Sequence, residues 1–360
     1  MGFNMKQFFM DIFKPIPGEE RIMVLYDTPH DRIKDNRDWE ERRLMAERWH
    51  RAIDQFKNSL NLELLPIVTY AATGTHNGNL PETCRVGNLD RNFLKEIENA
   101  TIIIAMTEYS ATAPLYLIAK KLSRLRVGSM PGVAPFMEDT GLSADYLKLN
   151  GIGKKLAPLF ENASAADVTF SSGETCRFDL SRKNIVYVDD GNLPPENAGT
   201  DYCLSNLPAG EVCCVPNEGS DSQTRGKLPV QIGEHKLVLT IEQNRIGQIE
   251  GNTEAAAELT SIFDVDPARR NIAEFAIGIN DRATVTGNVL QDEKAGFHWA
   301  YGRSDHLGGT VGVDAFRSPD TVEHTDIVYA KGNPIVAERI DLIQDDGSIV
   351  TVMKKGELIL

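Results

Sequence analysis

The sequence predicts an α/β N-terminal domain with a mostly parallel sheet, followed by a β-rich α+β domain. Between about residues 20 and 170, short apolar runs alternate with segments of helical periodicity. From about residue 181, short β-rich segments are separated by Asn, Gly and Asp turns. The polar stretch DDGNLPPENAG, at residues 189–199, is rich in turn formers and is the expected linker. We therefore expect domains at residues 1–190 and 200–360.

The expected strands of the first half are short and apolar. The first is IMVLY at residues 22–26, and others are expected at residues 62–70 and 100–106. The longest expected helix covers residues 38–56, where the apolar residues at helical spacing are Leu44, Trp49, Ile53 and Phe56. Further helices are expected at residues 92–98, 113–122 and 143–160. Strands that alternate with helices in this way indicate a parallel sheet with both faces covered.

The second half has a different pattern. Strands are expected at residues 236–241, 246–250 and 272–279, and one helix at residues 253–263 interrupts them. Short strands joined by turns pair mainly with their neighbours in sequence. The pattern therefore predicts an α+β domain dominated by antiparallel pairing.

The charge balance excludes several classes of partner. The chain has 38 Lys and Arg against 52 Asp and Glu, which gives a net charge of −14 at pH 7. Such a surplus repels phosphate backbones and anionic lipids, so we expect neither a nucleic-acid nor a membrane partner. The first residues do not read as a secretion signal. The five cysteines form no Cys-x-x-Cys pair, so no disulfide framework or zinc knuckle is expected. Together these features predict a cytoplasmic protein.

Two acidic residues of the second half stand in apolar surroundings. Glu211 ends a Pro/Gly turn at the start of an apolar run, and Glu274 lies in the middle of a nearly continuous apolar segment. A buried carboxylate without a partner is costly, so such a residue binds a cation or becomes protonated. A structural explanation stays open for each. Glu274 can form a buried ion pair with Arg269 or Arg270, and Glu211 can accept hydrogen bonds from backbone amides of its turn.

Two further segments combine histidine with an acid. His324 and Asp326 are two residues apart, so on a strand both point to the same face. Glu293 precedes His298, and Gly296 between them can turn the chain so that the two side chains approach each other. Imidazole and carboxylate ligands together suit zinc, cobalt, manganese or iron(II). Each pair occurs often by chance, but four such segments in one domain favour a metal site.

The runs LPAGEV, NIAEFAIGIN, DEKAGFHWAYG and EHTDIV follow one another in this order. Over about residues 205–329 the chain thereby resembles the aminopeptidase T family of metallopeptidases. The resemblance implies an N-terminal α/β domain, a C-terminal metal-binding catalytic domain and a homodimer. It also implies two divalent ions, zinc, cobalt, manganese or magnesium. Carried over residue by residue, the family's metal positions fall on Glu211, Glu274, Glu293, His298, His324 and Asp326.

The chain departs from the family at one catalytic position. Family peptidases carry a tyrosine seven residues after the first site histidine, and Asp305 stands there in this chain. The candidates to replace the tyrosine in stabilising a transition state are Tyr301 and His306. Glu293 lies outside the apolar strands and is the candidate to take the proton of an attacking water.

The resemblance implies a metal-dependent hydrolase, an aminopeptidase that releases N-terminal residues from short peptides by two-metal activation of water. The fold is also that of dihydroxypyridine dioxygenases, which use one iron(II) and present histidine at the position of Glu274, without an acid matching Glu211. Four carboxylates and two imidazoles can offset two dications, which favours hydrolysis. One alternative is the mono-iron dioxygenase. The other is a catalytically altered, metal-binding member of the family, which the presence of Asp305 favours.

Overall fold

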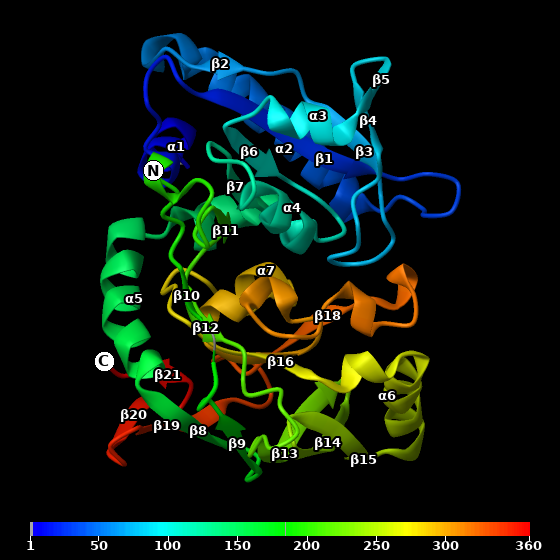
Figure 1. Ribbon diagram of the computed structural model, residues 1–360, viewed down its shortest axis with the longest axis vertical. Coiled ribbons are helices and arrows are strands. Elements are labelled where there is room, and N and C mark those ends of the chain that lie inside the picture. Colours follow the sequence, from blue (N-terminus) through cyan, green and yellow to red (C-terminus); the bar gives the residue numbers. More distant parts are fainter. Residues whose placement is uncertain (1–2, 184) are drawn as a thin grey trace. The chain divides into compact units, whose positions relative to one another are not determined.

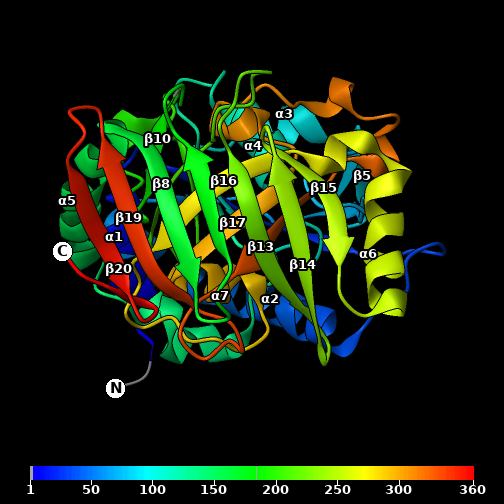
Figure 2. The ribbon, with the colours of Figure 1, turned by 90° about the horizontal axis from the view of Figure 1, so that it is seen from below.

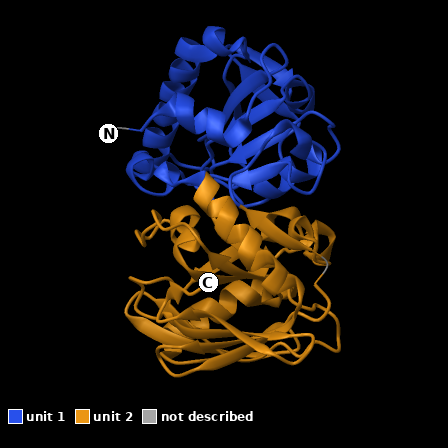
Figure 3. Cartoon of the chain, turned by 90° about the vertical axis from the view of Figure 1, so that its left-hand side faces the viewer, with its two compact units in different colours: residues 1–146, 190–209 blue, residues 147–189, 210–360 orange. Residues whose placement is uncertain are grey.

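A computed structural model describes residues 3–183 and 185–360, and it divides the chain into two compact units (Figure 3). The first unit consists of Met1–Tyr146 and Asp190–Ala209, and the second of Leu147–Asp189 and Gly210–Leu360. The chain therefore passes between the units at residues 146/147, 189/190 and 209/210. This division differs from the boundaries expected from the sequence, because residues 147–189 pack within the second unit.

The first unit is built on one sheet in the strand order β11-β7-β6-β1-β3-β4-β5, and β2 also pairs with β1 (Figure 1). The strands β11, β7, β6, β1 and β3 are parallel, and β4 and β5 add an antiparallel edge. This confirms the expected α/β class with a mostly parallel sheet. The strands are β1 (Arg21–Thr28), β2 (Glu63–Leu64), β3 (Val68–Ala71), β4 (Thr83–Val86), β5 (Leu89–Asn92), β6 (Ile102–Ala105), β7 (Arg126–Ser129) and β11 (Leu204–Asn206).

The helices of the first unit are α1 (Met5–Phe13), α2 (Arg37–Phe56), α3 (Phe93–Glu98) and α4 (Thr112–Ala119). Helix α2 begins after Asn36, whose side chain accepts a hydrogen bond from the Trp39 N–H. Its buried face includes Trp39, Trp49 and Ile53, whereas Leu44 is 55% exposed. The apolar spacing therefore predicted the helix but assigned one residue to the wrong face.

A buried ion pair holds the returning segment 190–209 in the first unit. The Arg126 guanidinium lies 2.5 Å from Oε1 of Glu20, and both side chains are almost fully buried. Arg126 also donates to the carbonyl oxygens of Phe13, at the end of α1, and of Leu193. One side chain thus joins the end of α1, the sheet and the segment that the sequence predicted to be a linker.

The second unit contains a five-stranded sheet, β10-β12-β16-β17-β18, and an eight-stranded antiparallel sheet, β15-β14-β13-β9-β8-β19-β20-β21 (Figure 2). All pairings in both sheets are antiparallel, as expected for the β-rich domain. The strands are β8 (Ala163–Phe170), β9 (Thr175–Asp179), β10 (Val186–Asp189), β12 (Glu211–Cys214), β13 (Arg225–Ile232), β14 (His235–Glu242), β15 (Arg245–Glu250), β16 (Ile272–Gly278), β17 (Phe297–Gly302), β18 (His324–Val328), β19 (Ala337–Gln344), β20 (Ile349–Lys354) and β21 (Glu357–Leu358). The helices are α5 (Tyr146–Glu161), α6 (Thr253–Val265) and α7 (Val289–Asp292).

Aromatic side chains fill the space between the two sheets of the second unit. Phe275 on β16 lies 5.0 Å, ring centre to ring centre, from Phe178 on β9. Phe170 on β8 lies 4.7 Å from Tyr329 and 6.3 Å from Phe297 on β17. Side chains of a strand alternate between its faces, so the opposite face of the five-stranded sheet is turned away from this core. That opposite face carries the acidic and histidine side chains.

Two differences from the expected elements have separate causes. The single strand expected at residues 62–70 is divided into two strands, β2 and β3. Pro66 lies between them, and because it has no backbone N–H it cannot donate a hydrogen bond to a neighbouring strand. The pair β8 and β9 was not expected, because its partners β19 and β13 are distant in sequence.

Within the described residues, the helices lack the length and apolar character needed to cross a membrane.

Candidate metal centre

Four adjacent strands of the five-stranded sheet bring ligand-type side chains to one face. The strands lie in the order β12, β16, β17, β18. In cross-strand register, Glu274 on β16 stands beside Ala300 on β17, which stands beside Asp326 on β18. Residues directly opposite each other in neighbouring strands share a face. His324 likewise stands opposite Gly302 of β17.

Small residues make room for this cluster. On β16 the residues beyond Glu274 on the same face are Ala276 and Gly278, while the large Phe275 and Ile277 point into the aromatic core. A Cβ added to Gly278 would lie 2.4 Å from the carbonyl oxygen of Glu293. Only glycine therefore lets the short 3₁₀ turn η6 (Glu293–Ala295) pass directly over the sheet.

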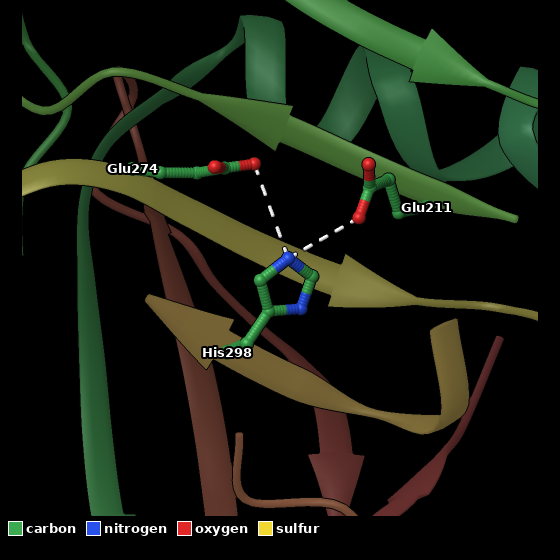
Figure 4. A group of neighbouring side chains, drawn as sticks. All are labelled: Glu211, Glu274 and His298. Carbon is green, nitrogen blue, oxygen red and sulfur yellow. Dashed lines mark ion pairs between the residues drawn. The ribbon is translucent and has the colours of Figure 1, made fainter. Parts of the chain in front are cut away.

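Glu274 stands between two imidazoles. Its Oε1 lies 3.9 Å from Nε2 of His298, and its Oε2 lies 3.1 Å from Nε2 of His324. Glu211 approaches the same Nε2 of His298 from the other side, at 3.2 Å (Figure 4). Asp326 lies 3.6 Å from Nε2 of His324. One carboxylate is thus shared by two histidine-centred groups.

Backbone carbonyl groups fix the ring orientation of both histidines through their Nδ1 atoms. Nδ1 of His298 lies 3.4 Å from the carbonyl oxygen of Gly296, and Nδ1 of His324 lies 2.7 Å from that of Arg303. A carbonyl can only accept, so each Nδ1 carries the proton and donates it. Each Nε2 is then directed into the cluster, which is the arrangement that metal-binding histidines use.

The ligand atoms of the six predicted residues form three overlapping groups, in each of which the atoms lie within 4.8 Å of one another. Position A is Glu211, Glu274 and His298. Position B is Glu274, His324 and Asp326. A third group contains Glu293, His298 and Asp326. The structure therefore brings together all six residues that the sequence predicted as ligands, within the second unit.

Burial and mutual charge shift the acids and histidines in opposite directions. Burial raises the pKa of Glu211, but Lys294 and His298 outweigh it and hold that pKa at about 2. Burial likewise raises the pKa of Asp326, but the hydrogen bond and charge of His324 bring it to about 2. Burial lowers the pKa of His298, yet Glu211 raises it to about 9. These shifts show that Glu211 and Asp326 are stabilised as carboxylates and His298 as a cation.

Glu293 differs from the other acids. Burial raises its pKa to about 8, with Asp326 and Glu211 acting in the same direction and Lys294 opposing them. A carboxyl group with a pKa near neutrality can both accept and release a proton at physiological pH. Its Oε1 lies 2.8 Å from Nζ of Lys294, so Oε2 is the oxygen directed away from that contact.

His306 lies beside the cluster, on the 3₁₀ turn η7 (Asp305–Leu307). Its ring packs edge-on against His324, with ring centres 4.9 Å apart, and it is 7% exposed. Burial lowers the pKa of His306, and the neighbouring charges of His324 and Arg303 act in the same direction against Asp305. His306 is therefore a neutral imidazole near neutral pH and can donate a hydrogen bond without carrying charge.

Asp305 forms an ion pair instead of pointing freely into the cluster. Its Oδ1 lies 2.5 Å from Nε of Arg303, and its Oδ2 lies 3.1 Å from the terminal Nη2. Arg303 is almost fully buried, and its carbonyl is the group that orients His324. Asp305 therefore acts on the cluster through Arg303.

The structure does not bring Tyr301 to the cluster. Tyr301 alternates with His298 and Ala300 along β17, so it points to the opposite face of the sheet. Its ring packs against Phe263 at 5.0 Å, and its hydroxyl lies 3.4 Å from Glu323. The strand register explains the difference, because an odd spacing from His298 reverses the face.

Neither purely structural role that the sequence left open for Glu274 and Glu211 is observed. Arg269 pairs with Glu323 and Arg270 with Asp264, so neither is the partner of Glu274. The side chain of Glu211 contacts Lys294 and His298 instead of turn amides. The acids are held by groups that belong to the cluster itself.

Three residues at this face were not predicted from the sequence. Lys294 is fully buried and contacts Glu211 and Glu293. Asp189 stands opposite Glu211 on β10 and lies 3.6 Å from Lys294 Nζ. Cys213 follows Glu211 by two residues on β12, a spacing that places it on the same face and was readable once the strand was recognised. Asp189 was hidden because its segment reads as a linker.

The residues present fit divalent metal ions. Four carboxylates and two oriented imidazoles are hard and borderline donors that suit such ions. Oε2 of Glu211 is buried and has no aligned hydrogen-bond donor among the described residues, although it points toward His298. A buried acceptor without a donor is costly, and a cation between Glu211 and His298 would satisfy it.

Comparisons with known proteins place the fold. No family model matches the sequence, and the search of curated proteins likewise gives no match. Among solved structures, 2,5-dihydroxypyridine dioxygenase from Pseudomonas putida KT2440 has a TM-score of 0.66 at 17% identity, over 99% of this chain and 96% of that chain. Wild-type AmpT from Thermus thermophilus has a TM-score of 0.57 at 14% identity, over 99% of each chain. The chain shares the fold of these proteins over nearly its whole length.

Proposed function

We propose that the protein is a metal-dependent hydrolase, an aminopeptidase that binds two divalent ions and releases N-terminal residues from short peptides. The observation that carries this proposal is the shared carboxylate, because the two oxygens of Glu274 face the Nε2 atoms of two different histidines. Such a carboxylate can serve two ions at neighbouring positions. The fold likeness to AmpT, an aminopeptidase T, supports the same conclusion.

Position A would hold one ion and position B the other, with Glu274 common to both. Ions bound there would lower the pKa of a water and polarise the carbonyl of the scissile peptide bond. Glu293 would take the proton of the attacking water at Oε2 and later deliver it to the leaving amine. Lys294 holds Oε1 of Glu293 at 2.8 Å, which fixes the direction of that carboxylate.

His306 would stabilise negative charge that develops on the carbonyl oxygen. It is neutral near pH 7, stands beside His324 and directly follows Asp305, the residue at the tyrosine position of the aminopeptidase T family. A donor aimed at a developing oxyanion is worth about 10²–10³ in rate. Tyr301 has no part in this step because it points to the other face of β17.

The two metal positions support a substrate with a free N-terminal amine. A neutral amine nitrogen is a donor of the same kind as the imidazole nitrogens of His298 and His324, so it could bind one of the two ions. Short peptides with free N-termini are therefore the proposed substrates.

The alternative is a ring-cleaving dioxygenase with one iron, and the TM-score of 0.66 with the dihydroxypyridine enzyme favours it. A mononuclear iron site of that kind uses two histidines and one carboxylate. Among the described residues, each of the three groups contains one histidine and two carboxylates. The donor chemistry therefore favours the hydrolase.

One experiment separates the two functions. Protein purified without chelator is analysed for metal content, then assayed on leucyl and alanyl peptides and for oxygen uptake with 2,5-dihydroxypyridine. We expect two divalent ions per chain and release of the N-terminal residue. One iron per chain with oxygen uptake, and no peptide hydrolysis, would establish the dioxygenase instead.

A further inference from the structure

Lys294 is a buried cation within the metal cluster. Its side chain is completely inaccessible to solvent, and Nζ lies 2.7 Å from Oε1 of Glu211 and 2.8 Å from Oε1 of Glu293. Oδ2 of Asp189 lies 3.6 Å away. A lysine is rarely buried unless its charge is paired. Here three acids surround one ammonium group.

The position of this lysine is set by the backbone. Lys294 lies in η6, and its carbonyl accepts a hydrogen bond from the Asn280 N–H. The turn passes so close to β16 that a Cβ on Gly278 would lie 2.4 Å from the carbonyl carbon of Lys294. The ammonium group is thus held in place and cannot withdraw to solvent.

Lys294 affects the two metal positions unequally. It contacts Glu211, which belongs only to position A, and Glu293, which belongs to neither A nor B. The ion pairs of its Nζ are with Asp189, Glu211 and Glu293, whereas its charge reaches Asp326 of position B only over a longer distance. An ion in position A would share the Glu211 carboxylate with a fixed positive charge, whereas an ion in position B would not. Repulsion between cations in a buried setting is strong.

We propose that Lys294 is a positioning residue that ranks the two metal positions, so that position B fills first and retains its ion while position A fills second and exchanges. This inference rests on the proposed two-metal function. Lys294 neutralises one oxygen of Glu211 and holds Oε1 of Glu293.

The test is a titration of metal-free protein with Co²⁺, followed by calorimetry and by visible absorption. The wild-type chain should bind two ions in two separate steps, and added chelator should remove the more weakly bound ion first. The Lys294→Met variant should raise the affinity of the second step by at least about tenfold, because a nearby positive charge is gone. Lys294→Arg, which keeps the charge, should retain two separate steps.

A matched control removes a lysine of the same unit outside the cluster. The amino group of Lys183 contacts the backbone carbonyls of Ala163 and Leu180, so Lys183→Met should leave both steps unchanged. Two further variants assign the steps to positions and remain informative if Lys294→Met does not fold. Glu211→Gln should lose the weaker step alone, and Asp326→Asn should lose the tighter step.

Three results would overturn the ranking. These are equal affinities in the wild-type chain, an unchanged ratio of affinities in a folded Lys294→Met variant, and loss of the tighter step in Glu211→Gln. Failure of the proposed function has a different signature, because saturating Co²⁺ would then give fewer than two bound ions in the wild-type chain. The readout throughout is metal binding, so loss of catalysis for another reason does not affect it.

Discussion

Glu274 and His324 contact each other across a strand that separates them. They belong to β16 and β18, which do not pair, yet Oε2 of Glu274 lies 3.1 Å from Nε2 of His324. The strand between them, β17, carries Ala300 and Gly302 on this face. The small size of these two residues is what allows the side chains to meet.

Ala300→Leu should therefore abolish binding of the ion in position B without removing any ligand. Ala300 stands beside both Glu274 and Asp326, so a larger side chain would push the two carboxylates apart. Overpacking of this kind costs about 1–3 kcal/mol of stability. Metal content after gel filtration and circular dichroism would show whether the ions are lost from a folded chain. Ala300→Gly, which frees space, should keep both ions; a folded Ala300→Leu variant with two ions would contradict the prediction.

Glu293→Gln should lower kcat by about 10²–10⁴ while the metal content stays at two ions. The reason is that Glu293 is assigned to proton transfer and Lys294 already engages its Oε1. Peptide hydrolysis and metal analysis of the same preparation provide the measurement. Glu250→Gln, an exposed change on β15, is the control. Loss of an ion from Glu293→Gln would show that Glu293 is a ligand and not the base.

His306→Ala and Tyr301→Phe should behave differently although both positions follow His298 closely. His306 packs against His324, so its removal should lower kcat by about 10²–10³. Tyr301 faces the core of the second unit, so loss of its hydroxyl should leave kcat/KM unchanged. Steady-state rates on an alanyl peptide compare the two. A large loss in Tyr301→Phe with a normal rate in His306→Ala would reverse the assignment.

Asp179→Asn should destabilise the second unit in a pH-dependent manner. Burial raises the pKa of Asp179, but donors from Gln223, Ser181 and Asn217 outweigh it and hold the pKa below its ordinary value. The stabilisation is therefore complete above the unfolded pKa of about 3.9 and is lost as pH falls through the lower folded value.

At pH 7 the free energy of unfolding should fall by about 1–3 kcal/mol in Asp179→Asn. The gap between wild type and variant should narrow at about pH 3, because this pH lies below the unfolded pKa of about 3.9 and the unfolded wild-type chain then takes up a proton. Urea unfolding at the two pH values is the measurement, and Asp314→Asn, at an exposed position, is the control. A gap that is constant or wider at low pH would contradict the assignment.

Much of the fold was predictable because its signals are local. The helices α2 and α6 and the strands β14, β15 and β16 follow from periodicity and turn residues within each segment. The strands β8 and β9 were missed although they form a local hairpin, because the second partner of each, β19 or β13, lies far along the chain. For the same reason residues 147–189 were assigned to the wrong part of the chain.

The candidate site divides in the same way. Buried acids and a His-x-Asp pair mark the ligands in the sequence, and the family resemblance supplied their grouping. Lys294 was missed although it is adjacent to Glu293, because a lysine in a polar segment normally faces solvent. Only the passage of η6 over Gly278 reveals that its ammonium group is buried. Tyr301 was expected at the site, but it lies three residues from His298 on β17, and an odd spacing on a strand places the two side chains on opposite faces.

The threefold passage of the chain between its units limits how the protein can be cut. A fragment beginning at residue 200, where the sequence suggested a boundary, would lack β8 and β9. These two strands lie between β13 and β19 in the eight-stranded sheet, so their loss would divide that sheet and create two new unpaired edges. Exposed edges of this kind recruit other chains. The fragment should precipitate, and a separately soluble second unit requires residues 147–189 to be joined to residues 210–360 by an artificial linker.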